Sequence, residues 1–243
     1  MSRAGGDGTD GGGTDGGGTD GGPWGPGAHE GHAGHERVRR SYDTVAEEYL
    51  RRIGDELDAK PLDRALLSAL VEESGEDGVV ADLGCGPGHV AGWLAGHGAA
   101  GVVGVDLSPA MVELGRARYP AVEFREGDLL RLPARDGEFT SAVALYSLIH
   151  LAPDELAPAL AEIGRVLRPG GALLLSFHIG AEVRHLGEWW GHAVDVEFHF
   201  LRPAAVAEAL RAAGFRIEAH LERAPYPHEA ETRRAYLLAR RSD

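Results

Sequence analysis

The sequence feature that most restricts the fold is a strand, loop, helix and strand unit over residues 79–106. It begins with a short apolar run, continues through glycines at alternate positions, and ends with a second apolar run that Asp106 closes. The three glycines are Gly84, Gly86 and Gly88. Glycine lets the backbone approach a ligand without a Cβ in the way, and an acid after the second strand accepts hydrogen bonds from ribose hydroxyls. The unit therefore predicts an open α/β sheet that presents a nucleoside-like cofactor at the carboxyl ends of its strands.

The spacing of these glycines narrows the choice of cofactor. A dinucleotide-binding fingerprint has the pattern G-x-G-x-x-G, in which the third glycine allows the helix to pack closely on the strand. Here His89 stands at that place and the pattern is G-x-G-x-G. The loop also lacks the Lys-Ser/Thr pair of a phosphate-binding loop. The sequence thus favours a ligand with a ribose and without a pyrophosphate, and disfavours NAD.

Residues 80–90 resemble motif I of the class I S-adenosylmethionine (SAM) dependent methyltransferases. Three further segments resemble motifs of that superfamily in the same order, and one motif alone would be a weak signal. These segments are residues 103–111, 124–129 and 165–174. Residues 146–150, followed by a helix that a proline initiates, resemble a small-molecule branch of the superfamily, the methyltransferases of type 11/25.

Short β runs alternate with helical patterns along the chain, which predicts a parallel, doubly wound α/β sheet. The resemblance implies a Rossmann-like sheet of seven strands in which the last strand inserts antiparallel between its predecessors. Strands are expected at residues 79–83, 102–106, 122–125, 141–146, 172–177, 215–221 and 235–239. Helices are expected at residues 37–52, after Pro61, at 88–97, after the Ser108 N-cap, at 153–166 and at 203–213.

The composition predicts two parts of unequal character. Residues 1–35 form a tail rich in Gly, Asp and Thr that has nothing apolar to bury, so we expect it to be disordered, with His35 in a solvated stretch. Residues 36–243 form one methyltransferase-like domain, with cap elements at 36–75 and 179–202. Residues 179–201 are long for a connection and contain Trp189 and Trp190. We expect this segment, with the helix that carries two tyrosines, to cover a flat or apolar acceptor.

Charge and cysteine content exclude several function classes. The formal net charge is −14, and the first 35 residues contribute five acids and one base, so the body remains strongly acidic and should repel nucleic acid. A single cysteine cannot form an internal disulfide. We find no signal peptide and no apolar stretch near 18 residues, so the sequence predicts a cytoplasmic protein without a membrane segment.

The resemblance implies a role for each acid that ends or follows a strand. Asp106 would bind the ribose, because Ser108 already caps the next helix. Asp82 would orient the glycine loop and approach the methionine moiety of SAM. Asp128 would accept from the adenine amino group, with a simple turn as the alternative. The residues expected to bind the cofactor are Tyr42, Tyr49, Asp82, Gly84, Cys85, Gly86, Gly88, Asp106, Leu107, Met111, Asp128, Leu129 and Tyr146. Cys85 is expected to fill a gap in the loop rather than to act as a thiolate.

Three histidines are candidates for a catalytic base. His150 follows the fourth strand and His178 ends the fifth, and a neutral imidazole can take a proton from a hydroxyl or ammonium group. His199 lies in the cap. For His150 the alternative is a histidine that only caps the next helix. Asp195, Glu197 and His199 alternate and could join a metal site, but methyl transfer from SAM needs no metal, so none is expected.

Together these features predict a SAM-dependent methyltransferase that acts on a small molecule and releases S-adenosylhomocysteine (SAH). An oxygen or nitrogen acceptor is preferred over carbon or sulfur. A nucleic-acid substrate is disfavoured, because the run after the fourth strand lacks the Asn/Asp-Pro-Pro-aromatic pattern of amino-methylating nucleic-acid enzymes. The alternative is a catalytically inactive module that binds SAM or a nucleoside and regulates. The chain is expected to be a monomer or a homodimer.

Overall fold

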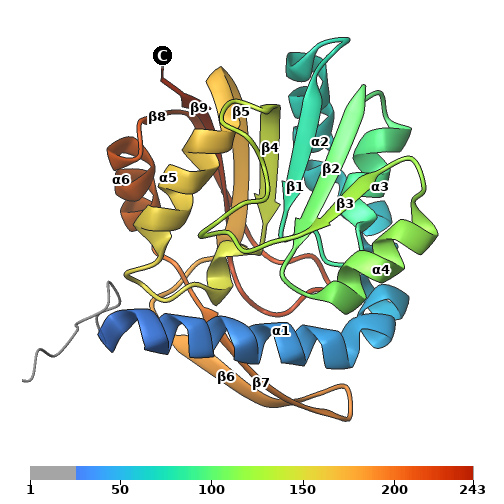
Figure 1. Ribbon diagram of the computed structural model, residues 1–243, viewed down its shortest axis with the longest axis vertical. Helices are drawn as coiled ribbons and strands as arrows, with labels where there is room; N and C mark the ends of the chain where they lie inside the picture. The colour runs from blue at the N-terminus through green and yellow to red at the C-terminus, as the bar shows by residue number, and fades with distance from the viewer. Residues whose placement is uncertain (1–25, 243) are drawn as a thin grey trace, which may run out of the picture.

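The computed structural model describes residues 26–242, with side chains from residue 33 onward. Seven strands form one sheet in the order β3-β2-β1-β4-β5-β9-β8, and β6 and β7 form a separate hairpin (Figure 1). The bounds of the sheet strands are β1 Val79–Leu83, β2 Gly101–Asp106, β3 Glu123–Glu126, β4 Phe139–Leu145, β5 Leu167–His178, β8 Phe215–Arg223 and β9 Arg234–Arg241.

The direction of the strands confirms the predicted topology. Strands β1 to β5 run parallel, with register pairs such as Asp82 with Gly104 and Val143 with Leu174. Strand β9 lies between β5 and β8 and is antiparallel to both. The chain order reverses at β1, whose neighbours are β2 on one side and β4 on the other. Open α/β sheets bind their ligands at such a point, outside the carboxyl ends of the strands.

Helices cover both faces of the sheet, which is why its strands are continuous apolar runs. Along β5, Leu173 and Leu175 join a core with residues of α5 and α6, whereas Leu174 joins a second core with residues of α2 and α3. Successive side chains of a strand point to opposite faces, so one strand supplies both cores. The helices on these faces are α2 Pro61–Ser74, α3 His89–Gly96, α4 Pro109–Arg118, α5 Leu156–Val166 and α6 Pro203–Ala212.

A long helix and a hairpin lie across the carboxyl edge of the sheet. Helix α1, Pro26–Ile53, crosses this edge, and the short helices η1, Glu56–Ala59, and η2, Leu148–His150, lie near the same edge (Figure 1). The hairpin of β6, Val183–Trp189, and β7, His192–His199, packs on the other side of α1. Its two-residue turn has positive φ at Trp190 and Gly191, the geometry that matches the twist of a hairpin. The segment predicted to be a cap is therefore an ordered hairpin that packs on α1.

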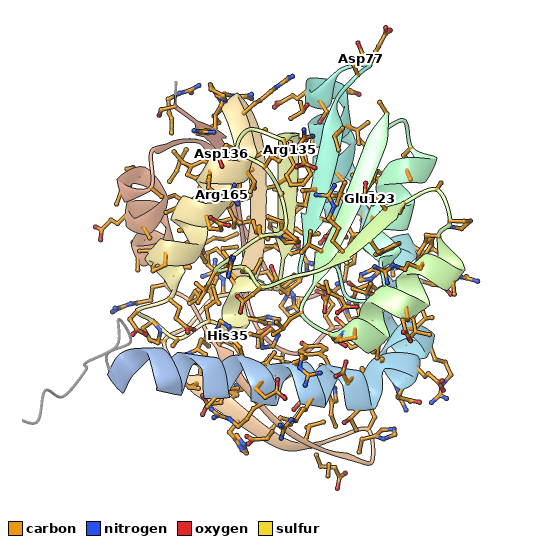
Figure 2. All side chains as sticks on the ribbon, viewed as in Figure 1. His35, Asp77, Glu123, Arg135, Asp136 and Arg165 are labelled. Atoms are coloured by element: carbon orange, nitrogen blue, oxygen red, sulfur yellow. The ribbon has the colours of Figure 1, made fainter. Side chains whose placement is uncertain are left out.

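The prediction of a disordered tail through residue 35 is wrong at its end, because α1 already begins at Pro26. The side chain of His35 lies on the face of α1 turned toward the domain and bonds to Asp128 and Glu155 (Figure 2). Those contacts come from segments far away in the sequence, so local composition did not reveal them. Residues 4–22 lie outside the described part of the chain. Between residues 26 and 242, none of the helices is both long enough and apolar enough to cross a membrane.

Candidate functional site

A cavity of about 450 Å³ opens at the carboxyl ends of β1, β2, β4 and β5, and residues of α1 line its opposite side. Its floor is the glycine loop after β1 together with the residues that follow β2 and β4. Its cover comes from α1, from η1 and from Trp189 and Phe198 of the hairpin. A covered cavity thus lies at the point where the strand order of the sheet reverses.

The glycine loop turns sharply at the floor of this cavity and is held by the backbone of β2. The amides of Gly84 and Cys85 both donate to the carbonyl of Val105, at 2.8 and 3.0 Å. Gly84 has a φ of 73°, and a Cβ there would lie 2.3 Å from the Cβ of Ser147. Only glycine fits this position, because the backbone is left-handed and the space is filled. Burial raises the pKa of the Cys85 thiol well above its usual value, so Cys85 fills the loop as a neutral side chain.

Asp106 links the glycine loop to the start of α4. Its Oδ2 accepts from the amide of Gly86 at 2.7 Å, and its Oδ1 accepts from the amide of Ser108 at 2.9 Å. Ser108 caps α4 by accepting from the amide of Met111, as predicted. Burial raises the pKa of Asp106 to about 6. The carboxylate lines the cavity and is fixed by two backbone donors, so a ribose hydroxyl can bind to it in a defined orientation.

Asp82 and Asp128 are the two other acids of the predicted set. Asp82 is 2% exposed, its Oδ2 has no hydrogen-bond partner among the described residues, and burial raises its pKa to about 7. A buried oxygen of this kind facing a cavity can accept from a ligand donor. Asp128 accepts from the amide of Leu130 at 2.8 Å and pairs with Nδ1 of His35 at 2.5 Å.

An aromatic wall faces the glycine loop across the cavity. We use this term for Tyr42 and Tyr49 of α1 and Trp189 and Phe198 of the hairpin. The ring of Trp189 meets Tyr42, Tyr49 and Phe198 edge-on, with centroids 5.6 to 5.8 Å apart. Edge-to-face contacts at this distance fix each ring relative to its neighbours. The wall is therefore a preformed apolar surface that α1 and the hairpin build together.

The two histidines at the ends of β4 and β5 both reach the cavity. Nε2 of His150 lies 2.8 Å from the hydroxyl of Tyr42, and Nδ1 lies 3.1 Å from the carbonyl oxygen of Glu197. Nδ1 of His178 lies 2.8 Å from the hydroxyl of Thr232. Burial lowers the pKa of each imidazole to about 4, so both rings are neutral near pH 7.

Comparison with known proteins identifies the fold family. Residues 80–171 match a family model described as a methyltransferase domain. A probable SAM-dependent methyltransferase of Mycolicibacterium smegmatis is 34% identical over 167 residues, which cover 60% of this chain and 64% of the relative. Both matches support the class I SAM-dependent methyltransferase superfamily as the family that this chain resembles.

Two further proteins are similar to this chain, one in sequence and one in fold. A demethylmenaquinone methyltransferase of Beutenbergia cavernae is 39% identical over 113 residues, 46% of this chain and 45% of the relative. The chain thus spans less than two thirds of the length of these curated relatives. The solved 1,6-didemethyltoxoflavin-N1-methyltransferase of Burkholderia thailandensis shares the fold, with a TM-score of 0.68, 24% identity and coverage of 88% of this chain and 91% of that one.

Three residues of the predicted superfamily site do not line the cavity. Met111, in the first turn of α4, is fully buried, Gly88 packs against Phe124, and His199 sits at the base of the hairpin. A Cβ on Gly88 would lie 2.4 Å from the Phe124 ring, so its role is close packing of the loop. The other predicted residues line the cavity: Tyr42, Tyr49, Asp82, Gly84, Cys85, Gly86, Asp106, Leu107, Asp128, Leu129, Tyr146, His150 and His178.

The acidic cap residues do not assemble a metal site in this methyltransferase fold. Asp195 pairs with His185 at 2.9 Å, and Glu197 lies 3.8 Å from His199. His178 instead faces Thr232 across the sheet end. From residue 33 to residue 242, the structure contains no group of three ligating side chains that could hold a metal ion.

Sequence reasoning missed a cluster of charges at one end of the cavity, which we call the charged end. Lys60 is 5% exposed and pairs with Glu56 at 2.8 Å and with Glu229 at 3.5 Å. Burial lowers the pKa of Lys60, but Glu56, together with Tyr146 and Asp63, outweighs it and holds the pKa above its usual value. Glu56 also bonds to His89 at 3.2 Å, so the charged end touches the glycine loop. The four-residue spacing of Glu56 and Lys60 was a local signal, whereas their other partners come from distant segments.

Tyr146 joins the charged end to the end of β4. Its φ is 58°, a left-handed conformation that non-glycine residues rarely adopt. Its ring lies 5.0 Å from the ring of His178 and 5.5 Å from Nζ of Lys60. Strained residues of this kind cluster at binding and active sites. The observed strain therefore supports the predicted place of Tyr146 in the site.

Proposed function

We propose that this protein transfers a methyl group from SAM to an oxygen or nitrogen atom of a small molecule. The observation that carries the proposal is one covered cavity that runs from the glycine loop and Asp106 to the aromatic wall and the end of β4. A single covered cavity can align two reactants and limit the access of water, which is most of what this reaction needs from a protein.

The residues at the floor of the cavity fit the parts of SAM. Asp106 would accept from the ribose hydroxyls, and the unpartnered Oδ2 of Asp82 suits a donor such as the ammonium group of the methionine moiety. Asp128 and Leu129 are the candidates for the adenine, as the resemblance implies. SAM would supply an activated sulfonium methyl. Its carbon–sulfur bond would break with the electron pair leaving on sulfur as SAH, while the acceptor's lone pair bonds to carbon and an O–H or N–H acceptor then releases its proton to solvent. The chain's residues bind, align and exclude water.

The acceptor side of the cavity favours a small and flat molecule. The aromatic wall offers apolar ring faces and edges, and neutral histidines offer hydrogen-bond partners. The relatives named above act, by their names, on demethylmenaquinone and on 1,6-didemethyltoxoflavin. The strongly acidic body argues against nucleic acid as a substrate.

The first experiment measures cofactor binding by titration calorimetry with SAM, SAH and NAD. We expect SAM and SAH to bind and NAD not to bind. Asp106→Ala should weaken SAM binding by about 1–3 kcal/mol through the lost charge-assisted pair. Asp77→Ala is the matched control, because Asp77 is exposed at the opposite end of the sheet (Figure 2). Unchanged SAM affinity in Asp106→Ala would contradict the assignment of the loop.

The second experiment measures transfer of label from methyl-labelled SAM into a crude metabolite extract. Labelled small molecules would support the transferase. Binding of SAM without transfer to any fraction would instead leave the chain with the alternative role of a binding module.

A further inference from the structure

The cavity contains a directed chain of hydrogen bonds between three elements that cover it. The carbonyl oxygen of Glu197 on β7 lies 3.1 Å from Nδ1 of His150, and Nε2 of His150 lies 2.8 Å from the hydroxyl of Tyr42 on α1. A carbonyl oxygen can only accept, so Nδ1 carries the proton. In a neutral imidazole Nε2 then has only a lone pair, so the Tyr42 hydroxyl must donate to it.

Burial keeps both side chains in these protonation states. It lowers the pKa of His150 to about 4, with His199 adding in the same direction and the Glu197 carbonyl opposing it. Burial, with Tyr49 and Asp106 nearby, raises the pKa of the Tyr42 hydroxyl well above its usual value. The lone pair of His150 is therefore already used by a partner that stays protonated. A direct base, as predicted from sequence, would need that lone pair free for the acceptor.

The position of the tyrosine ring is fixed from several sides. It meets Trp189 edge-on at 5.6 Å, Tyr49 at 5.9 Å and the His150 ring at 5.2 Å. The His150 ring also packs at 5.1 Å from Phe198. Because the Tyr42 hydroxyl hydrogen points to His150, the remaining lone pairs of its oxygen are left to accept from a donor in the cavity.

We propose that His150 is a positioning residue that acts through Tyr42, whose oxygen accepts a hydrogen bond from the O–H or N–H group of the methyl acceptor. This inference rests on the proposed function. It adds that the methyl acceptor is a flat molecule whose reacting oxygen or nitrogen carries an exchangeable hydrogen. Tyr42 touches the acceptor and orients the reacting lone pair. Glu197 contributes only its backbone carbonyl, which fixes the tautomer of His150, so the hairpin and the acceptor site are coupled.

Four variants separate this role from that of a direct base. Tyr42→Phe and His150→Ala should each lower kcat by a similar factor, about 10-fold to 100-fold, because the first removes the oriented oxygen and the second removes the group that orients it. The double variant should be no slower than either single variant. His150→Gln should stay within about 3-fold of the wild type, because its amide oxygen can accept from Tyr42 although it cannot take up a proton. Tyr119→Phe and His97→Gln, which lie outside the cavity, are the matched controls.

Turnover is measured as label transfer from SAM, with kcat and KM separated on the purified fraction of extract that accepts the label. SAH affinity by calorimetry should be unchanged in all these variants, because Tyr42 then contacts the methyl acceptor and not the cofactor, which corrects its assignment from the sequence. If SAH does not bind the wild type, the proposed function fails. If SAH binds and label is transferred but His150→Gln is as slow as His150→Ala while Tyr42→Phe is fast, His150 is a direct base and this inference is wrong. Wild-type kcat and KM in Tyr42→Phe would also overturn it.

A second measurement needs no acceptor. Nitrogen-15 NMR of the histidine rings in the SAH complex should show His150 protonated at Nδ1 and unprotonated at Nε2, without titration between pH 8 and 5. Tyr42→Phe removes the donor to Nε2 and should shift only that nitrogen's resonance. Protonation at Nε2, or a titration midpoint near 6.5, would contradict the hydrogen-bond direction on which the inference depends.

Discussion

The two ends of the cavity are built in different ways. At the glycine loop, backbone groups and one carboxylate from residues 82–108 hold each other through short-range bonds. At the charged end, Lys60 pairs with Glu229 across 169 positions of sequence, and Glu56 bonds to His89 across 33. The loop end is thus specified by a local motif, whereas the charged end exists only once the whole domain has closed.

The charged end continues below the cavity into a buried network. Tyr236 is fully buried, and its hydroxyl lies 3.1 Å from both oxygens of Asp63. Arg223 pairs with Asp63 at 3.4 Å and with Glu229 at 2.6 Å. Burial raises the pKa of Asp63, which shows that its charge is costly there. Such a network ties α2 to the antiparallel edge of the sheet, and removing one member leaves the others unpaired.

The largest effect is expected from breaking this network. Asp63→Ala leaves the Tyr236 hydroxyl without its acceptor and Arg223 with one acid fewer, so the free energy of unfolding should fall by about 3–5 kcal/mol. Urea denaturation measures the loss. The exposed Asp77→Ala variant is the control and should change stability by less than about 0.5 kcal/mol. Equal effects of the two variants would mean that the network contributes no net stability.

Gly88→Ala tests the close packing at the end of the cavity that the glycine loop forms. Gly88 has a φ of 82° and faces Phe124, whereas Gly214 has a φ of 84° and open space around its Cβ position. Both variants incur the left-handed backbone penalty of about 1–2 kcal/mol, and Gly88→Ala adds a clash with a buried ring worth about 1–3 kcal/mol more. The difference between their unfolding free energies measures the close packing. No difference would show that the ring of Phe124 moves freely.

His35 joins α1 to the cavity floor and gives a pH-dependent contribution. Its hydrogen bond to Asp128, with Glu155 beside it, raises the pKa of His35 to about 9, although burial opposes this. The folded-state pKa lies above the unfolded value of about 6.5, so the stabilisation is fully present below pH 6.5 and is lost as pH rises through 9. As the pH rises from 6.5 to above 9, the free energy of unfolding of the wild type should fall by about 1–3 kcal/mol relative to that of His35→Ala. Thermal unfolding across this range checks it, and parallel pH profiles would contradict it.

The smallest effect is expected from shortening the N-terminal segment. Residues 4–22 are almost entirely Gly, Asp and Thr, so deleting them should shift the melting temperature by less than about 2 °C. Extending the deletion through residue 35 removes His35 and should lower the melting temperature further. A large loss from the shorter deletion would show that this polar segment contributes to the fold.

The sequence predicted those parts of the site whose geometry is local. Gly84, Asp106 and the Ser108 cap could be placed because strand period, glycine spacing and capping act over a few residues. Met111 was misplaced for a related reason, since helical spacing puts it near the loop but only packing decides that it points into the core. The sequence identified His150 as a candidate site residue, but it did not identify Tyr42 as its hydrogen-bond partner.

The chain's sequence by itself determined the order of strands and helices, the glycine loop and the acids at strand ends, because each depends on neighbouring residues. Tertiary structure alone decided that His35 reaches Asp128, that Lys60 joins the cavity and that Tyr42 donates to His150. The contacts of His35 with Asp128, of Tyr42 with His150 and of Lys60 with Glu229 join side chains 93, 108 and 169 positions apart, and no local pattern encodes such separations. Burial then sets their protonation, because the pKa of a side chain depends on the solvent and charges that the folded chain leaves around it.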